Sequence, residues 1–198
     1  MANAVRVGAP AKSARTTGGL LSGPEGTPLP TDATTDLAPG LVGLGLIGNA
    51  GLAETPSRST EEIRDWNGDI ARTVQSEHGL TVTFTIIERT LQALREVHGQ
   101  GNVTETVDGT TGDTLRVIKY NSEELPVRVY VAEMRDRGGV RIRKVYPLGQ
   151  ITEIAEIPHV KNGPIQYECT MTAYPDEDGN NEYEYELIPA TTAPAPAA

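Results

Sequence analysis

The feature that most restricts how this chain can fold is the composition of its first sixty residues, which hold ten of the 21 glycines and six of the 14 prolines. Gly loses more backbone freedom on ordering than any other residue, and Pro lacks the N–H that helices and sheets use. The stretch nevertheless carries spaced apolar anchors: Leu20, Leu21, Leu29, Leu37 and the run at 41–47. We therefore expect residues 1–53 to form an N-terminal arm and first strands that other chains complete. The alternative is a long irregular loop that covers the chain's own core.

The charge of the chain lies outside this arm. The whole sequence has 17 Lys and Arg against 27 Asp and Glu, a net charge of −10, whereas the first sixty residues are balanced. Such an acidic excess argues against nucleic-acid binding, which needs cations to neutralise phosphates. No apolar run suits a signal peptide or a membrane span, so we expect a soluble protein that is made and assembled in a cytoplasm.

Residues that usually carry catalysis or bind metals are few and scattered. His78, His98 and His159 fall in different predicted elements without metal-ligand spacing. Cys169, the only cysteine, alternates with apolar residues, which predicts a buried structural thiol. The letters GLGLIG at 43–48 match a dinucleotide fingerprint, but no βαβ unit follows. We expect no enzyme activity, no cofactor and no metal.

The arm is followed by a charged segment and then by clear secondary structure. Residues 54–68 are polar and charged around Trp66, and predict a long charged loop or a short irregular strand. Residues 79–88 alternate between apolar side chains and threonines, which predicts a strand. Residues 89–98 have helical spacing and are followed by Gly99, which predicts the one helix.

Six more strands are expected, at 114–120, 127–134, 140–146, 150–157, 164–174 and 182–188. The Pro- and Ala-rich end, residues 189–198, predicts a disordered tail. Residues 69–188 should thus form the folded domain, a mainly β, antiparallel sandwich or partial barrel with one flanking helix.

Polar rows on the predicted strands are candidates for functional surfaces. The first two rows are Thr81, Thr83 and Thr85, and Gln166, Glu168, Thr170 and Thr172. A row of Glu182, Glu184 and Glu186 is expected on a solvated outer face, and Arg141 with Arg143 could face acidic neighbours across subunits. A lone Trp is unfavourable in water, so Trp66 is expected to anchor a contact between subunits. The alternative is that Trp66 folds back onto its own core.

Several segments, in this order and spacing, carry a family likeness: GGLLSGPEGTPLPTDA (18–33), LVGLGLIGNAGLAET (41–55), EEIRDWNGDIARTVQSEH (61–78), FTIIERTLQALREVHG (84–99), SEELPVRVYVAEMRD (122–136), 149–153 and YECTMTAYPDEDGN (167–180). Together they resemble the major tail tube protein of long-tailed, non-contractile (siphovirus-type) bacteriophages, and most closely the version in phages of actinobacteria. The likeness covers nearly the whole chain. One difference is that the Gly-rich LVGLGLIG stands where the family has an aromatic-rich arm strand.

The resemblance implies hexameric rings that stack into a tube in the virion, and a lumen through which phage DNA passes during ejection. The implied partners are further copies of the chain, the tape measure protein, and the tail tip and tail terminator proteins. The arm and the long loop would contact neighbouring rings, with candidate contacts Leu20, Leu21, Leu29, Arg58 and Trp66. The candidate lumen residues are the first two polar rows, because a tube that conducts a polyanion must not bind it. Removal of Met1 to Asp36 should then leave a folded monomer that cannot extend a tube.

Two other functions compete with this one. A virion decoration or carbohydrate-binding β domain should present exposed aromatic residues in a groove, whereas this chain has one Trp and places most of its Tyr residues on predicted core faces. A hydrolase should show a catalytic triad or a set of metal ligands, and the sequence offers neither.

Overall fold

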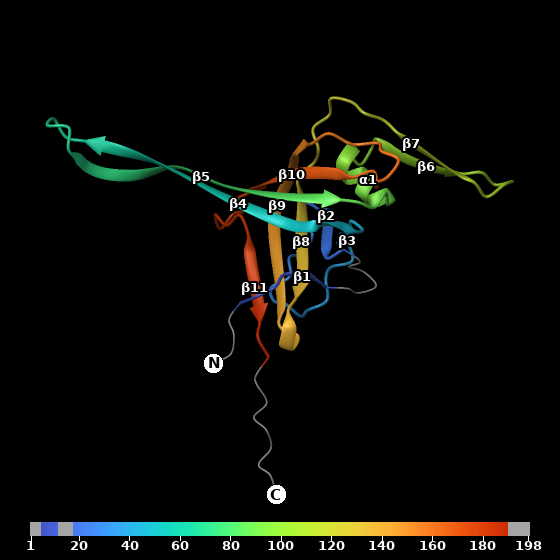
Figure 1. Ribbon diagram of the computed structural model, residues 1–198, viewed down its shortest axis with the longest axis horizontal. Helices are drawn as coiled ribbons and strands as arrows, with labels where there is room; N and C mark the ends of the chain where they lie inside the picture. Colours follow the sequence, from blue (N-terminus) through green and yellow to red (C-terminus); the bar gives the residue numbers. More distant parts are fainter. Residues whose placement is uncertain (1–4, 12–17, 190–198) are drawn as a thin grey trace, which may run out of the picture.

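The computed structural model describes residues 5–11 and 18–189, and it is mainly β with one α-helix (Figure 1). The described strands are β1 (Ala9–Pro10), β2 (Leu20–Pro24), β3 (Val42–Gly43), β4 (Ile47–Arg64), β5 (Ile70–Ile86), β6 (Val103–Val107), β7 (Thr114–Ile118), β8 (Arg128–Arg135), β9 (Arg141–Ile154), β10 (Tyr167–Tyr174) and β11 (Tyr183–Leu187). Nine of them form one antiparallel sheet in the order β3-β2-β8-β9-β10-β5-β4, with β1 beside β8 and β11 beside β9; β6 and β7 form a separate hairpin. The predicted fold class is confirmed. The tail predicted at 189–198 lies, apart from Pro189, outside the described residues.

The strands predicted at 140–146 and 150–157 are one continuous strand, β9, which pairs with two neighbours in turn. Its first part pairs with β11 and its second part with β10, while β8 lies along its other side. The sequence suggested a break because Pro147 and Gly149 normally interrupt strands. Gly149 is instead required by packing, since a Cβ there would come within 2.7 Å of the Tyr130 ring.

The Gly- and Pro-rich first region contributes to the chain's own core. β2 pairs with β8 from Leu20 opposite Ala132 to Pro24 opposite Arg128. Leu20 and Leu21 are 1% and 0% exposed and belong to two different core clusters. The prediction that these two leucines contact a neighbouring subunit is therefore wrong, and the alternative, a segment that covers its own core, is the one observed.

The two core clusters lie on opposite faces of the sheet, because successive strand residues point in opposite directions. The larger cluster packs beneath the helix and includes Phe84, Tyr130 and Met171. The smaller cluster covers β2, β8 and the first part of β9, and the segment with Leu37 and Leu41 closes it. Among the described residues, no such cover lies over the corresponding face of β5 and β10.

The helix, α1, spans Leu91–His98 and confirms the one predicted at 89–98. Thr90 caps its start, where the hydroxyl accepts a hydrogen bond from the Ala93 N–H at 3.1 Å. Gly99 ends it with a φ of 96°, a conformation that Gly adopts without strain.

A buried ion pair holds α1 against the sheet. Glu96 is 3% exposed, and its carboxylate lies 2.8 Å from Nε of Arg128 on β8. The carboxylate also accepts hydrogen bonds from the Tyr130 hydroxyl at 3.0 Å and from Ser22 and Gln92. Burial raises the pKa of Glu96, and the Arg128 charge and these donors oppose that rise. The network joins the helix to β2 and β8.

Strands β4 and β5 continue well beyond the sheet as a two-stranded hairpin, at the left of Figure 1. Their pairing extends from the body to Arg64 opposite Ile70. We call residues 57–78 the distal hairpin. Every residue in it is exposed except Val74, which is half-buried.

The charged loop predicted at 54–68 is corrected by this hairpin. Residues 54–64 belong to β4, and only 65–69 form a turn. Asp65 closes the turn, since its carboxylate accepts the backbone N–H groups of Asn67 and Asp69, each at 2.9 Å. The sequence indicated at most a short irregular strand here, because side chains that are exposed on both faces need not alternate.

Candidate functional surfaces

A polar surface covers one face of the sheet where β4, β5, β10 and the second part of β9 lie side by side. The register sets Glu168 opposite Thr85, Thr170 opposite Thr83 and Thr172 opposite Thr81. Directly opposed residues share a face, so six of the seven residues predicted to face a lumen form one surface, which we call the threonine face. The seventh, Gln166, precedes β10 and lies outside this ladder.

The threonine face extends over β9 and β4 through residues that the sequence did not single out. Oγ1 of Thr152 on β9 lies 3.1 Å from Oγ1 of Thr172, and the Thr81 hydroxyl bonds to the Thr55 carbonyl on β4 at 3.4 Å. The β9–β10 register shifts at this point, between Thr170 and Met171. Such a bulge breaks the alternation from which a sequence pattern is read.

The charged groups of this face are carboxylates. Glu168 and Glu153 are both exposed, and they lie opposite Thr85 and Thr170 in the ladders. The segments that form the surface are 47–55, 79–86, 149–154 and 167–174, and none contains a lysine or an arginine. The surface therefore offers hydroxyl and carboxylate groups but no cation with which to hold a polyanion.

The distal hairpin presents apolar side chains to solvent near its turn. Trp66 is fully exposed, and Ile63 and Ile70 are 51% and 52% exposed. Ile63 lies opposite Arg72, on the face that Val74 also shares, whereas Ile70 lies opposite Arg64 beyond a register shift. Exposed apolar groups gathered on a two-stranded hairpin indicate an interaction surface. The alternative that Trp66 folds back onto the chain's own core is wrong.

Two other predicted contacts also lie at the surface. Arg58, on the distal hairpin, is exposed and donates a hydrogen bond to Oε1 of Gln75 at 3.1 Å. Leu29 is 37% exposed. Their contact with other subunits stays a prediction.

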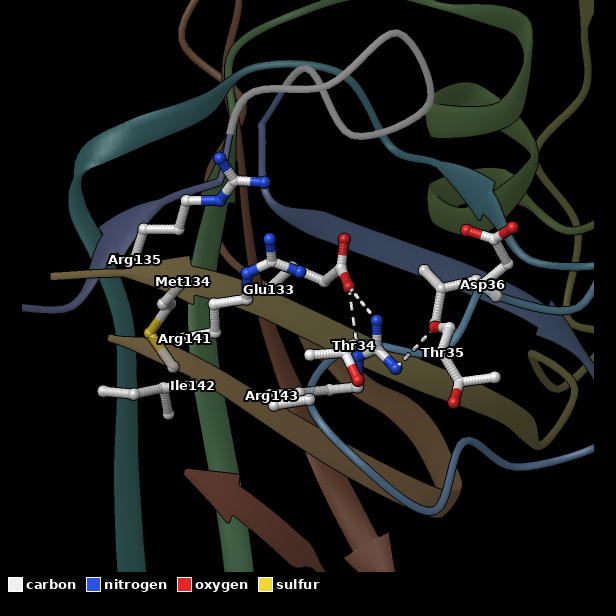
Figure 2. Close-up of a pocket in the computed structure, with 11 residues that line it drawn as sticks. Thr34, Thr35, Asp36, Glu133, Met134, Arg135, Arg141, Ile142 and Arg143 are labelled. Carbon is white, nitrogen blue, oxygen red and sulfur yellow. Dashed lines mark hydrogen bonds and ion pairs between the residues drawn. The ribbon is translucent and has the colours of Figure 1, made fainter. Parts of the chain in front are cut away.

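Arg141 and Arg143, predicted as one basic row, have different surroundings (Figure 2). Arg143 is 4% exposed and donates to the Glu133 carboxylate and to the carbonyl oxygens of Asp32 and Thr35, at 2.8 and 2.9 Å. It therefore holds the 32–35 turn on the sheet and does not face another subunit. Arg141 is exposed. Both arginines line a small cleft of about 190 Å³, together with residues 33–37 and 133–135.

The predicted acidic row on β11 is not simply solvated. Nζ of Lys144 on β9 lies 2.6 Å from the Glu54 carboxylate, 3.0 Å from that of Glu184 and 3.5 Å from that of Glu182. The Tyr146 hydroxyl donates to Glu54, and burial together with this carboxylate raises the pKa of Tyr146. This cluster ties β4, β9 and β11 together.

The described residues show no metal-binding group and no reactive thiol. Within 5–11 and 18–189, no three His, Cys, Asp or Glu side chains are grouped to hold a metal ion. Cys169 is fully buried, and burial raises the pKa of its thiol to about 12, so little reactive thiolate forms near neutral pH. No helix in the described part of the chain is long and apolar enough to cross a membrane.

The sequence matches the family model for phage tail tube proteins over residues 11–198. The chain belongs to the phage tail tube protein family. It is therefore a structural component of the virion and not an enzyme, and the resemblance read from the sequence is confirmed at the level of the tail tube family. No curated protein matches the sequence.

Proposed function

We propose that this tail tube protein is the major tail tube subunit of a long-tailed, non-contractile phage. Six copies form a ring, the rings stack into a tube, and the joined sheets line a lumen that conducts DNA during ejection. The observation that supports this proposal most strongly is the threonine face, an uncovered sheet surface whose four strand segments, 47–55, 79–86, 149–154 and 167–174, contain no lysine or arginine.

The chemistry of this face suits a conduit. Each cation placed against a phosphate releases counterions and adds salt-dependent affinity, which would retard a moving DNA molecule. Threonine hydroxyls stay hydrated without attracting the polyanion, and the carboxylates of Glu153 and Glu168 repel it over roughly 10 Å at 0.1 M salt. The opposite face of these strands is closed by the larger core cluster and α1. The threonine face is thus the side of this half of the sheet that is free to line a lumen.

The distal hairpin supplies the contacts between rings in this proposal. It extends away from the body and carries Trp66, Ile63 and Ile70 exposed. Arg58 on the hairpin and Leu29 on the body are the further candidate contacts. The tape measure, tail tip and tail terminator proteins would contact the same tube at its lumen and its ends.

The test of the lumen assignment is the variant Glu168→Lys in whole virions, with ejection followed by a DNA-binding dye at low and high salt. Glu177→Lys, on the exposed turn after β10, is the matched control with the same charge change. We expect Glu168→Lys to slow ejection at low salt and to recover at high salt, because salt screens the new contact. Ejection by Glu168→Lys that matches the control at both salt concentrations would show that the threonine face lies elsewhere.

A further inference from the structure

A groove and a basic turn lie at opposite ends of the ladder between β8 and β9. We propose that the β8–β9 turn of one subunit docks in this groove of the next subunit, so that copies join head to tail along the tube. This inference rests on the proposed tube and adds the pair of surfaces that would meet.

The groove is acidic with an apolar floor. It has a volume of about 850 Å³, and the described residues that line it include the carboxylates of Glu123 and Glu124 but neither lysine nor arginine. Leu125 and Ile151 are among its apolar residues. A groove of this size, with acidic walls and an apolar floor, suits a cationic segment whose aliphatic stems can contact that floor.

One aromatic side chain in the lining is almost entirely in solvent. Tyr120 is 90% exposed. An amphipathic ring left in water in this way is typical of a residue that a binding partner covers.

The turn at the other end is basic and narrow. Arg135 and Arg141 are directly opposite each other in the ladder, and Arg137 lies in the short 3-10 turn Arg137–Gly139 between them. All three are exposed, and none forms an ion pair with a carboxylate among the described residues. Like charges directly opposite in a ladder are destabilising, so this turn gains from a carboxylate supplied by another chain.

Glycine makes the turn tight enough to project. Gly138 and Gly139 have φ values of 72° and 82°, which other residues rarely adopt. The turn presents three guanidinium groups with the Asp136 carboxyl among them, and Pro189 lies 3.4 Å from the position that a Cβ on Gly139 would take.

The positions of the two surfaces fit a repeating contact. Residues 121–125 lead into β8, and the turn at 137–139 leaves it, so the eight-residue strand separates groove and turn by roughly 25 Å. The region before β8 lies at the top of Figure 1 and the turn at the bottom. Because each copy then uses its turn and its groove on different neighbours, the contact is heterologous, and it builds a stack or a ring of copies and not a two-fold dimer.

Charge exchange tests the pairing in the full chain. Arg137→Glu with Arg141→Glu should raise the protein concentration needed for tubes by at least about tenfold, since opposed carboxylates would meet. Adding Glu123→Arg and Glu124→Arg to the same chain should restore tubes at the wild-type concentration. Lys161→Glu, an exposed cation on another loop, is the control and should change nothing.

Disulfide capture then identifies the occupant of the groove. The double variant Arg137→Cys with Glu124→Cys should give a ladder of crosslinked multimers on oxidation, whereas either single variant should not. The pair Trp66→Cys with Glu124→Cys tests the hairpin tip as the occupant and should give none. The buried Cys169 does not interfere.

The outcomes separate this contact from the tube itself. Two results would overturn the docking and leave the tube proposal intact. One is that the Arg137→Glu, Arg141→Glu variant forms tubes at the wild-type concentration. The other is that the Trp66 pair gives a crosslinked ladder and the Arg137 pair does not. A wild-type chain that forms no tubes under any condition would overturn both.

Discussion

Strands β4 and β5 pass through two different environments. Near the body, residues 80–86 of β5 alternate between buried and half-buried side chains, with Val82 and Ile86 both 0% exposed. In the distal hairpin, residues 70–78 of the same strand are exposed apart from the half-buried Val74. The backbone pairing is nevertheless continuous between the two parts.

The difference shows that backbone hydrogen bonds alone can form a paired strand, whereas side-chain burial is what stabilises it. An isolated two-stranded hairpin is only marginally stable in water. The distal hairpin adds exposed polar pairs, such as Arg58 with Gln75, that contribute little each. The body is therefore expected to fold alone, whereas the distal hairpin gains its firm order from a neighbour.

The largest expected effect comes from removing residues 1–36. The deletion takes away β2, including Leu20, Leu21 and the Ser22 bond to Glu96, so the truncated chain should lose its cooperative thermal transition. This reverses the expectation from sequence that the truncated monomer stays folded. Circular dichroism on heating measures the transition. A truncated chain with the wild-type spectrum and transition would show that the body folds without the arm, and that only neighbouring subunits need it.

Removing one member of the buried ion pair should cost somewhat less. Glu96→Ala leaves Arg128 buried without its carboxylate, and we expect a loss of about 3–5 kcal/mol in the free energy of unfolding. The matched change in the distal hairpin, Glu62→Ala, breaks an exposed pair with Arg64 and should cost less than about 1 kcal/mol. Urea unfolding of both variants makes the comparison, and equal losses would contradict it.

Two substitutions within β5 sharpen the contrast along one strand. Phe84, 3% exposed, should lose about 3–5 kcal/mol of stability on change to Ala. Val74→Ala, in the distal hairpin, should lose less than about 1 kcal/mol, because little burial is removed. A large loss at Val74 in the monomer would show that the hairpin packs on the body.

The smallest effect on the monomer is expected from Trp66→Ala. Its side chain is fully exposed, so the unfolding free energy should change by less than about 0.5 kcal/mol. Tube formation should nevertheless weaken, because an aromatic anchor at an interface carries much of the binding energy. Thermal unfolding and electron microscopy of the same preparation measure both. Normal tubes from this variant would remove Trp66 from the interface.

The sequence predicted those parts of the molecule in which side-chain burial follows backbone geometry. The alternation at 79–88 and the spacing at 89–98 located the body part of β5 and the helix, because each has one face in the core. The rows on β5 and β10 were identified separately, and only the register showed that they form one surface.

The remainder followed no such pattern. β2 follows Gly19 and ends in Pro24, and these residues obscured a strand that is buried on both faces. The distal hairpin has no core face at all, so its strands resembled a loop. Arg143 looked like a surface cation, and only the fold brings Glu133 and the 32–35 turn around it.

The most direct test of the central claim is cryo-electron microscopy of tubes assembled from the purified full-length chain. The account predicts stacked six-membered rings, the threonine face of β4, β5, β9 and β10 along the lumen, and the distal hairpin ordered against the adjacent ring. A tube whose lumen is lined by another face, or a chain that stays monomeric at every concentration tested, would contradict it.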